Sequence, residues 1–446
     1  MNSLRRLIAI VVGLSLTQAG AVFAQSSERT LIRDRNGVTL VDFRGAAGER
    51  PFPLGANAAQ LLAALCQDAR SASGKPLDLT LDARIQTIAE RALRAVPRGA
   101  AVVIDPGTGD ILAMASVPSF DPNIKTPEAV LPLAGDETKP LANRAIREAA
   151  PGAAFMVVTG LAGGRKGLGD SKISCSGSVF YGDKEMKCWI SAKGGEHGLL
   201  SLDDAMKASC GPYFFQYGNK AGIADIVHTG KLLGLGMRSG LPLPEEEAGI
   251  LPGPEWLRTV SPEGRWSMGY TANVSIGQGS VTATPLQMAM VAATIGNGGR
   301  SFFPRLLLND PVRLRVDLRA EGWKAEQIEV VRRGMWRVVN EGGSTGARAR
   351  IPEVSVAGKT GTAQSWRDHR GERVKDNHAW FIAFAPYENP KFAVCVFVEG
   401  ARSGGGVSAP IAGRILAECL HPTAATPIEA LEAAKGSFEP VEAIGE

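Results

Sequence analysis

Residues 100–117 constrain the fold of this chain more than any other segment. Two apolar stretches, Ala100–Ile104 and Ile111–Val117, flank the turn sequence Asp105-Pro-Gly-Thr-Gly109, and this pattern predicts two strands separated by a turn. Three more sheet strands are predicted near the C-terminus, over Val354–Ser365, Ala379–Ala385 and Phe392–Glu399.

Helical patterns lie before, between and after these strands. Asp82 can cap a helix whose apolar residues recur at helical spacing from Ile85 to Leu93. Thr284-Pro285 supplies a cap and a first-turn proline, and that helix ends around Gly296-Asn-Gly-Gly299. A closing helix is predicted over Ala409–Leu420. The chain is therefore predicted to be α+β.

Length and charge narrow the possible functions. The 446 residues suggest two or three domains, and 44% hydrophobic residues can build a sizeable core. The net charge is +4, but two of the 49 basic residues, Arg5 and Arg6, precede an apolar leader, which leaves 47 against 45 acidic residues. Because no basic stripe with interleaved aromatic residues is present, a nucleic-acid partner is not expected.

The N-terminus has the layout of a targeting segment. Arg5-Arg6 is followed by the apolar run Leu7–Leu16, and Val22-Phe23-Ala24 offers small residues at a cleavage site. Residues 1–24 are therefore predicted to be a signal peptide or an uncleaved membrane anchor, and the apolar run is short for a span. Both alternatives predict an extracytoplasmic (periplasmic) protein, secreted or anchored to the cytoplasmic membrane. Residues 421–446 are predicted to be a flexible tail.

A series of motifs between Ile32 and Leu420 carries a family resemblance. In chain order they are Ile32–Gly37, Pro51–Gly55, Leu79–Gln86, Val103–Ala113, Asn143–Ile146, Ser275–Gly279, Thr282–Gln287, Gly358–Gln364 and Ala379–Pro386. Together they resemble a class B penicillin-binding protein of the elongation-type D,D-transpeptidase (penicillin-binding protein 2) group. The resemblance implies a serine β-lactamase-like transpeptidase fold over residues 76–420, with an antiparallel sheet flanked by helices plus an all-helical part. Residues 25–75 would be a truncated remnant of the family's N-terminal pedestal.

The first catalytic motif of this family is altered. Where the family reads Pro-Gly-Ser-Thr-Phe-Lys, residues 151–156 read Pro-Gly-Ala-Ala-Phe-Met, so Ala153 and Met156 stand for the nucleophile and the Lys. The second motif, Ser-x-Asn or Ser-x-Asp in the family, is Ser209-Cys210-Gly211. Acyl transfer needs an activated hydroxyl and a base. The sequence therefore predicts a pseudoenzyme with no catalytic residues.

Of two alternatives to a native pseudoenzyme, only the second remains open from the sequence. A laboratory Ser-to-Ala change would account for Ala153 but not for Met156 and Gly211 as well. A substitute nucleophile would preserve D,D-transpeptidase or carboxypeptidase activity, and Ser209 is the better candidate because Thr159 falls on the opposite side of the predicted helix from Ala153.

The third motif is intact, as Lys359-Thr360-Gly361-Thr362. In the family this strand lines the cleft and holds the substrate's carboxylate, so the resemblance implies substrate binding; a Lys kept for packing at a strand end is the other interpretation. The expected ligand is a peptidoglycan stem peptide or a β-lactam, bound without a covalent bond. Membrane proteins of cell-wall synthesis are the other expected partners.

Four residues form a candidate metal site. Cys175, Cys188, His197 and Cys210 are spaced C-x12-C-x8-H-x12-C, and three thiolates with one imidazole make a closed tetrahedral set for zinc. The resemblance supports this, because some relatives carry zinc at the corresponding positions. A Cys175–Cys188 disulfide with Cys210 free is the alternative. The expected zinc is structural, and no catalytic cofactor is expected.

Overall fold

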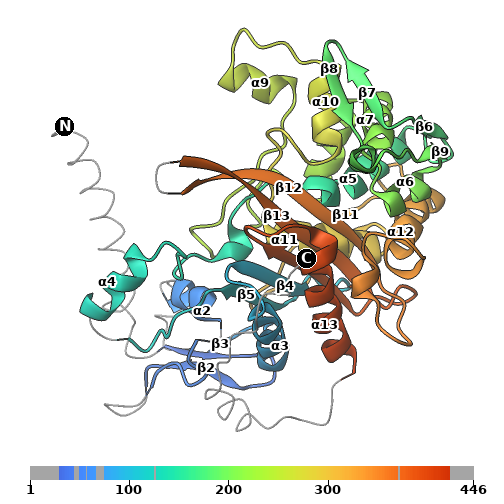
Figure 1. Cartoon of the computed structure of the whole chain (residues 1–446). Coiled ribbons are helices and arrows are strands. Elements are labelled where there is room, and N and C mark those ends of the chain that lie inside the picture. The colour runs from blue at the N-terminus through green and yellow to red at the C-terminus, as the bar shows by residue number, and fades with distance from the viewer. Residues whose placement is uncertain are drawn as a thin grey trace.

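A five-stranded antiparallel sheet lies at the centre of the molecule (Figure 1), in the order β12-β13-β14-β4-β5. The structure, a computed structural model, describes residues 30–44, 50–56, 58–66, 75–124, 127–369 and 372–421. The strands are β4 (Gly99–Ile104), β5 (Ile111–Val117), β12 (Ala357–His369), β13 (Glu372–Ala385) and β14 (Phe392–Val398). The central β14–β4 pairing joins the predicted N-terminal strand pair to the C-terminal strands.

Alternation along the central strands buries both faces of the sheet. Ala101 and Val103 belong to a core shared with α3 (Ala83–Leu93) and α13 (Ala409–Leu420). Ala100 and Val102 point the other way, into the larger core that contains α11 (Pro285–Gly296). The predicted α+β fold, an antiparallel sheet flanked by helices, is confirmed.

The local signals for the helices act as expected. The Asp82 carboxylate accepts hydrogen bonds from the backbone N–H groups of Arg84 and Ile85 at 2.9 and 3.1 Å, which caps α3. Thr284 and Gln287 form a reciprocal capping box at the start of α11.

The predicted ends of two strands were wrong. β12 begins at Ala357 rather than Val354 and continues to His369, while β13 begins at Glu372 rather than Ala379. The polar stretch between them pairs in register, from Gln364 opposite Asn377 to His369 opposite Glu372. Backbone pairing continues through polar residues of this ribbon, so an apolar pattern does not mark its length.

The remaining helices pack mainly beyond the β12 edge and around the sheet. They are α4 (Pro127–Gly135), α5 (Met156–Arg165), α6 (Leu202–Ala208), α7 (Gly211–Ala221), α8 (Ile223–Leu232), α9 (Pro254–Val260), α10 (Met268–Ser275) and α12 (Ala325–Asn340). Short helical turns are η2 (Arg144–Ile146), η3 (Gly152–Phe155), η4 (Trp189–Lys193), η5 (Ala347–Ala349) and the π-helical η6 (Gly404–Ser408).

The fold also contains three two-stranded antiparallel ribbons. They pair β6 (Ile173–Cys175) with β9 (Gly198–Leu200), β7 (Ser178–Tyr181) with β8 (Lys184–Lys187), and β10 (Arg300–Phe302) with β11 (Leu314–Asp317). In Figure 1, β6 to β9 gather with α7 and α10 on one side of the sheet.

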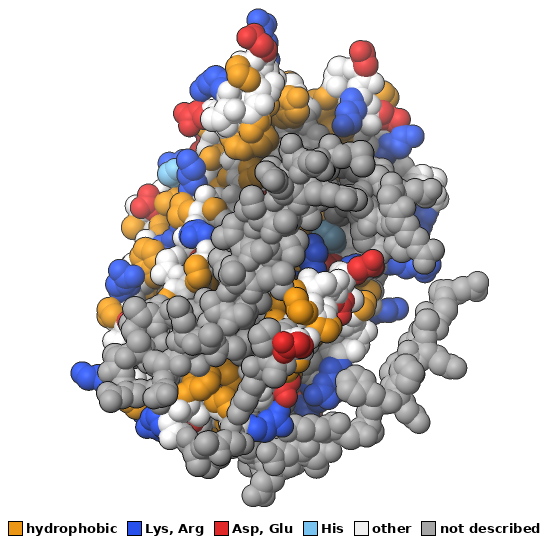
Figure 2. Space-filling model, turned by 90° about the vertical axis from the view of Figure 1, so that its left-hand side faces the viewer, with side chains coloured by type: hydrophobic (Ala, Val, Ile, Leu, Met, Phe, Trp, Pro, Cys, Tyr) orange, Lys and Arg blue, Asp and Glu red, His pale blue; other side chains and the backbone are white. Residues whose placement is uncertain are grey.

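The N-terminal region packs onto the same body. It contains α2 (Ala59–Cys66) and a small sheet of β1 (Leu31–Arg33), β2 (Thr39–Asp42) and β3 (Leu77–Asp78). Most of its apolar side chains belong to the core that contains α11, while Ala59 and Ala63 of α2 cluster with Phe120. The predicted leader, residues 1–24, lies outside the described residues, as does the predicted tail after His421. Among the described residues no helix is both long and apolar enough to cross a membrane. The face shown in Figure 2 carries basic and acidic side chains interspersed.

Candidate functional site

A cavity of about 880 Å³ collects residues from all three motifs. Ala153 and Met156 reach it from η3 and the start of α5, Ser209 from the end of α6, and Thr360 and Thr362 from β12. Its volume falls within the range of sites that enclose small organic ligands. Segments separated by more than two hundred residues therefore form one site.

Close backbone contacts hold the altered hexapeptide in place. A Cβ on Gly152, which has a φ of +55°, would lie 2.5 Å from the Thr362 carbonyl oxygen. A Cβ on Gly361 would lie well inside van der Waals contact with the Pro151 carbonyl oxygen. Only glycine allows these approaches. The hexapeptide is therefore packed closely against β12, although the side chain of residue 153 is only a methyl group.

Met156 and Lys359 meet at Ser209. The Lys359 ammonium donates a hydrogen bond of 2.9 Å to Ser209 Oγ, and that oxygen lies 3.9 Å from Met156 Sδ. Ser209 ends α6 in the left-handed conformation, with a φ of 51°. Lys359 is fully buried, and loss of hydration lowers its pKa to about 7. The third-motif Lys is therefore a buried group behind Ser209 rather than an exposed cation in the cavity.

The other third-motif residues have separate positions. The Thr360 hydroxyl donates to Thr345 Oγ1 at 3.0 Å, and the Thr362 hydroxyl accepts from the backbone N–H of Gly404 at 3.2 Å. Both side chains line the cavity, whereas Gly361 packs under Pro151. These hydroxyls are the groups of the motif that face the cavity.

At Gly211, an aromatic ring lies where the second motif has lost its third side chain. A Cβ at this position would lie 3.2 Å from the Phe215 ring, and Phe215 is 3% exposed. With Met156 and Ile276 it forms an apolar floor of the cavity. Phe215 follows Gly211 by four residues in α7, which places the ring on the same helix face; its position in the cavity lining was not predicted from the sequence.

An ion-pair network, also missed by sequence reasoning, fixes the helix that ends at Ser209. Asp203 in α6 contacts Arg333 at 2.9 Å and Arg337 at 3.2 Å, both from α12, and Arg337 reaches Asp204 at 2.8 Å. Burial would raise the pKa of Asp203, but hydrogen bonds from Ser201 and Arg333 hold it below its usual value. The pairs join residues more than a hundred positions apart, so no spacing in the sequence could indicate them.

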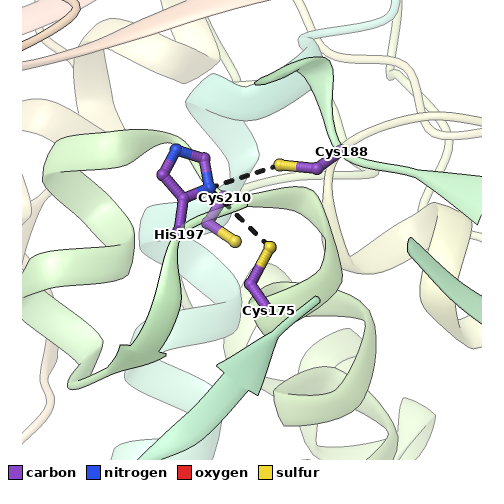
Figure 3. A group of neighbouring side chains, drawn as sticks. All are labelled: Cys175, Cys188, His197 and Cys210. Carbon is purple, nitrogen blue, oxygen red and sulfur yellow. Dashed lines mark hydrogen bonds between the residues drawn. The ribbon is translucent and has the colours of Figure 1, made fainter. Parts of the chain in front are cut away.

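The four candidate metal ligands come together in a second cluster (Figure 3), where their side chains point toward one another. Their donor atoms all lie within 4.8 Å of one another; His197 Nδ1 is 3.4 Å from Cys188 Sγ and 3.8 Å from Cys175 Sγ. A zinc tetrahedron with bonds of about 2.0 Å to nitrogen and 2.3 Å to sulfur has edges of about 3.5–3.8 Å. The donor set therefore fits zinc, and all four sulfur and nitrogen donors would be used.

The thiols of this cluster have unusual proton affinities. A hydrogen bond from Cys210 is the main reason that the pKa of Cys188 falls to about 5, and the same contact, with burial, raises the pKa of Cys210. Cys175 and Cys188 are unpaired thiols in the structure.

Comparison with known proteins gives consistent matches. The family "Penicillin binding protein transpeptidase domain" matches residues 99–417. "Peptidoglycan D,D-transpeptidase MrdA" from Acinetobacter baumannii is 34% identical over 361 residues, which cover 75% of this chain and 52% of that protein. "Peptidoglycan D,D-transpeptidase PbpA" from Mycobacterium tuberculosis is 31% identical, over 79% of this chain and 74% of that protein. This chain spans 52% to 62% of the length of the first MrdA relatives.

Solved structures agree in fold. Pseudomonas aeruginosa PBP2 in complex with WCK 5153 superposes with a TM-score of 0.75 at 29% identity, covering 88% of this chain and 95% of that chain. A complex between PBP2 and MreC from Helicobacter pylori gives a TM-score of 0.68 at 27% identity, covering 77% and 64%.

Proposed function

Because this chain belongs to the penicillin-binding protein transpeptidase family, in its class B PBP2 group, we propose that it serves cell-wall (peptidoglycan) synthesis by binding rather than by acyl transfer. The family resemblance expected from the motifs is confirmed. One observation carries the proposal beyond the family: Ala153 and Met156 face the cavity where a nucleophile and its base would stand.

The chemistry of these two side chains is the reason that acyl transfer would be lost. A methyl group cannot attack a carbonyl carbon, and a thioether neither accepts nor donates a proton near neutral pH. Loss of the nucleophile alone costs roughly a million-fold in hydrolases where it has been measured, and further losses add little because the groups act as a unit.

The retained groups suit reversible recognition of a carboxylate. Thr360 and Thr362 present hydroxyls to the cavity, and the Lys359 ammonium lies directly behind Ser209. We therefore propose that the cavity holds the D-Ala end of a stem peptide, or a β-lactam, without a covalent bond. The complex of a relative with MreC supports cell-wall synthesis proteins as a second class of partner. An extracytoplasmic location, secreted or membrane-anchored, would place the protein beside these partners.

A fluorescent penicillin tests the proposal. Purified protein incubated with the penicillin should give no adduct in intact-mass spectra, whereas calorimetry with acetyl-D-Ala-D-Ala peptides should detect reversible binding that Thr362→Val weakens. A stoichiometric covalent adduct would contradict the pseudoenzyme. Absence of peptide binding would contradict recognition of the stem peptide.

One contact favours an alternative, an active D,D-transpeptidase or carboxypeptidase that uses Ser209. Its hydroxyl lies 2.9 Å from Lys359 Nζ, whose pKa of about 7 leaves a substantial neutral fraction at neutral pH. In that case Oγ would bond to the carbonyl carbon while Lys359 takes its proton, and the C–N bond would break with the proton passing to the leaving amine. An adduct that disappears in Ser209→Ala and persists in Ser344→Ala would establish this alternative.

We further propose a structural zinc at Cys175, Cys188, His197 and Cys210. When bound, the ion would supply cross-linking rather than catalysis, because four protein ligands leave no open position for water. It would tie the segment around Cys210 to the β7–β8 ribbon. Elemental analysis after dialysis should find one zinc per chain, and Cys210→Ser should lose it while Cys395→Ser retains it. A metal-free protein with a Cys175–Cys188 crosslink in its peptide map would refute the site.

A further inference from the structure

The charges that line the cavity all have one sign. Among the described residues that line it, the side chains that are charged near neutral pH are Lys187 and Arg348, and no carboxylate is present. Cavities of one sign concentrate ligands of the opposite sign. The cavity is therefore suited to an anionic ligand.

The two cations stand on different walls. Lys187 ends β8, in the ribbon that packs against α7, and its backbone borders Gly211. Arg348 lies in η5, which packs against α13 and η6, and its guanidinium donates to the Gly406 carbonyl at 3.3 Å. Among the described residues no carboxylate lies within ion-pair distance of Arg348. One wall therefore provides a cation next to the second motif, and the other provides a cation on the side of η5.

Arg348 stands on the same wall as the hydroxyls that would receive a terminal carboxylate. Thr345, three residues before it, shares a hydrogen bond with Thr360. Lys187 faces the cavity from the other wall, next to the exposed ring of Trp189, whose indole N–H is anchored on the Ala208 carbonyl at 2.9 Å. The same cavity also contains the apolar lining that includes Met156 and Phe215.

Glu185 would compete with a ligand carboxylate for Lys187. Glu185 lies 3.3 Å from the Lys187 ammonium, and the two side chains are 37% and 64% exposed. Exposed pairs of this kind are weak because water screens the two charges, so a ligand carboxylate can displace Glu185.

We propose that the cleft selects a peptide with two acidic groups, a C-terminal carboxylate on the Arg348 wall and a side-chain carboxylate upstream that reaches Lys187. This inference rests on the proposed peptide-binding function and adds Lys187 as a specificity-determining residue. An apolar segment of the ligand lies over the floor between the two anionic ends. Because Lys187 is exposed, the preference is about three- to fivefold and decreases with added salt.

Two peptides that differ only in one charge test the proposal. Binding of acetyl-Glu-D-Ala-D-Ala and acetyl-Lys-D-Ala-D-Ala is measured by calorimetry on the full chain at low and high salt. The Glu peptide should bind about three to five times more tightly at low salt. Lys187→Gln should abolish this preference and Glu185→Gln should enlarge it. Lys193→Gln is the matched control, since that ammonium lies over the Trp189 ring and is not among the described residues that line the cavity.

The outcomes separate peptide binding from charge selection. Equal binding of both peptides to the unaltered protein, or a preference that survives Lys187→Gln, would overturn the role of Lys187 and leave peptide binding standing. Binding of neither peptide would overturn peptide binding and the charge selection together. Arg348→Gln should weaken both peptides by the same factor, because it meets the carboxylate that they share.

Discussion

Replacing Lys359 with Met should change how the stability of this protein depends on pH. Lys359 is fully buried, and its hydrogen bonds go to Ser209 Oγ at 2.9 Å and to the Thr360 carbonyl at 3.0 Å. Neither acceptor carries a charge, so desolvation of the ammonium dominates and lowers the pKa to about 7. Methionine keeps the unbranched stem and removes the titrating group.

The sign and size of this pH dependence of stability follow from proton linkage. The pKa of Lys359 is lower in the folded chain than in the unfolded chain, so the penalty for burying the ammonium is fully present below pH 7. It is relieved as the pH rises toward the unfolded pKa of about 10.4, because only the folded state has then released its proton. With a folded pKa of about 7, this group should make the protein about 2 kcal/mol more stable at pH 9 than at pH 7.

Urea unfolding at several pH values from 7 to 9, with reductant and chelator fixed, measures this slope. The difference between wild type and Lys359→Met isolates the residue, since all other titrations are shared. Lys391→Met, at an exposed position, is the control and should keep the wild-type slope. Equal pH slopes in wild type and Lys359→Met would refute the conclusion that this Lys titrates near neutrality.

Three further changes test other contacts. Gly361→Ala should lower stability by about 1–3 kcal/mol because its Cβ would meet the Pro151 carbonyl; an unchanged melting temperature would contradict that packing. Met156→Lys should cost about 2–4 kcal/mol near neutral pH, since a second ammonium would be buried beside the Ser209 hydroxyl that already faces Lys359; a melting temperature equal to wild type would show that the pocket accepts the charge. Arg337→Met should cost about 1–3 kcal/mol and speed amide exchange in α6; unchanged exchange would exclude a role in fixing that helix.

Matched control variants separate these expected effects from general destabilisation by a substitution. Gly342→Ala adds the same methyl group where nothing lies within 4 Å. Met156→Leu keeps the volume of the side chain without a charge and should cost less than about 1.5 kcal/mol. Arg414→Met removes a more exposed guanidinium that pairs with Glu418, one turn away, and should change stability by at most about 0.5 kcal/mol.

Local sequence signals were sufficient where the physics is local. The Asp82 cap, the Thr284 capping box and the apolar runs of β4, β5 and β14 each act within a few residues, and these elements formed as predicted. The ends of β12 and β13 were not predictable in this way. Their outer parts are polar and depend on pairing with each other, which an apolar pattern does not record.

For the site, the sequence by itself determined which functional groups exist. It showed that Ala153 and Met156 carry neither a nucleophile nor a base, that Lys359 to Thr362 remain, and that three Cys and one His have zinc-ligand chemistry. The residue type at each position is given by the sequence. Packing therefore cannot supply a hydroxyl group that position 153 lacks.

Only the tertiary structure decided which of these groups meet. Ser209 contacts Met156 across 53 residues and Lys359 across 150, and its helix is held by arginines of α12. The positions of the two cations on different cavity walls likewise depend on how elements that are distant in the sequence pack together. Contacts at such separations arise from burial of whole faces, and a linear pattern holds no record of the partner that each face will find.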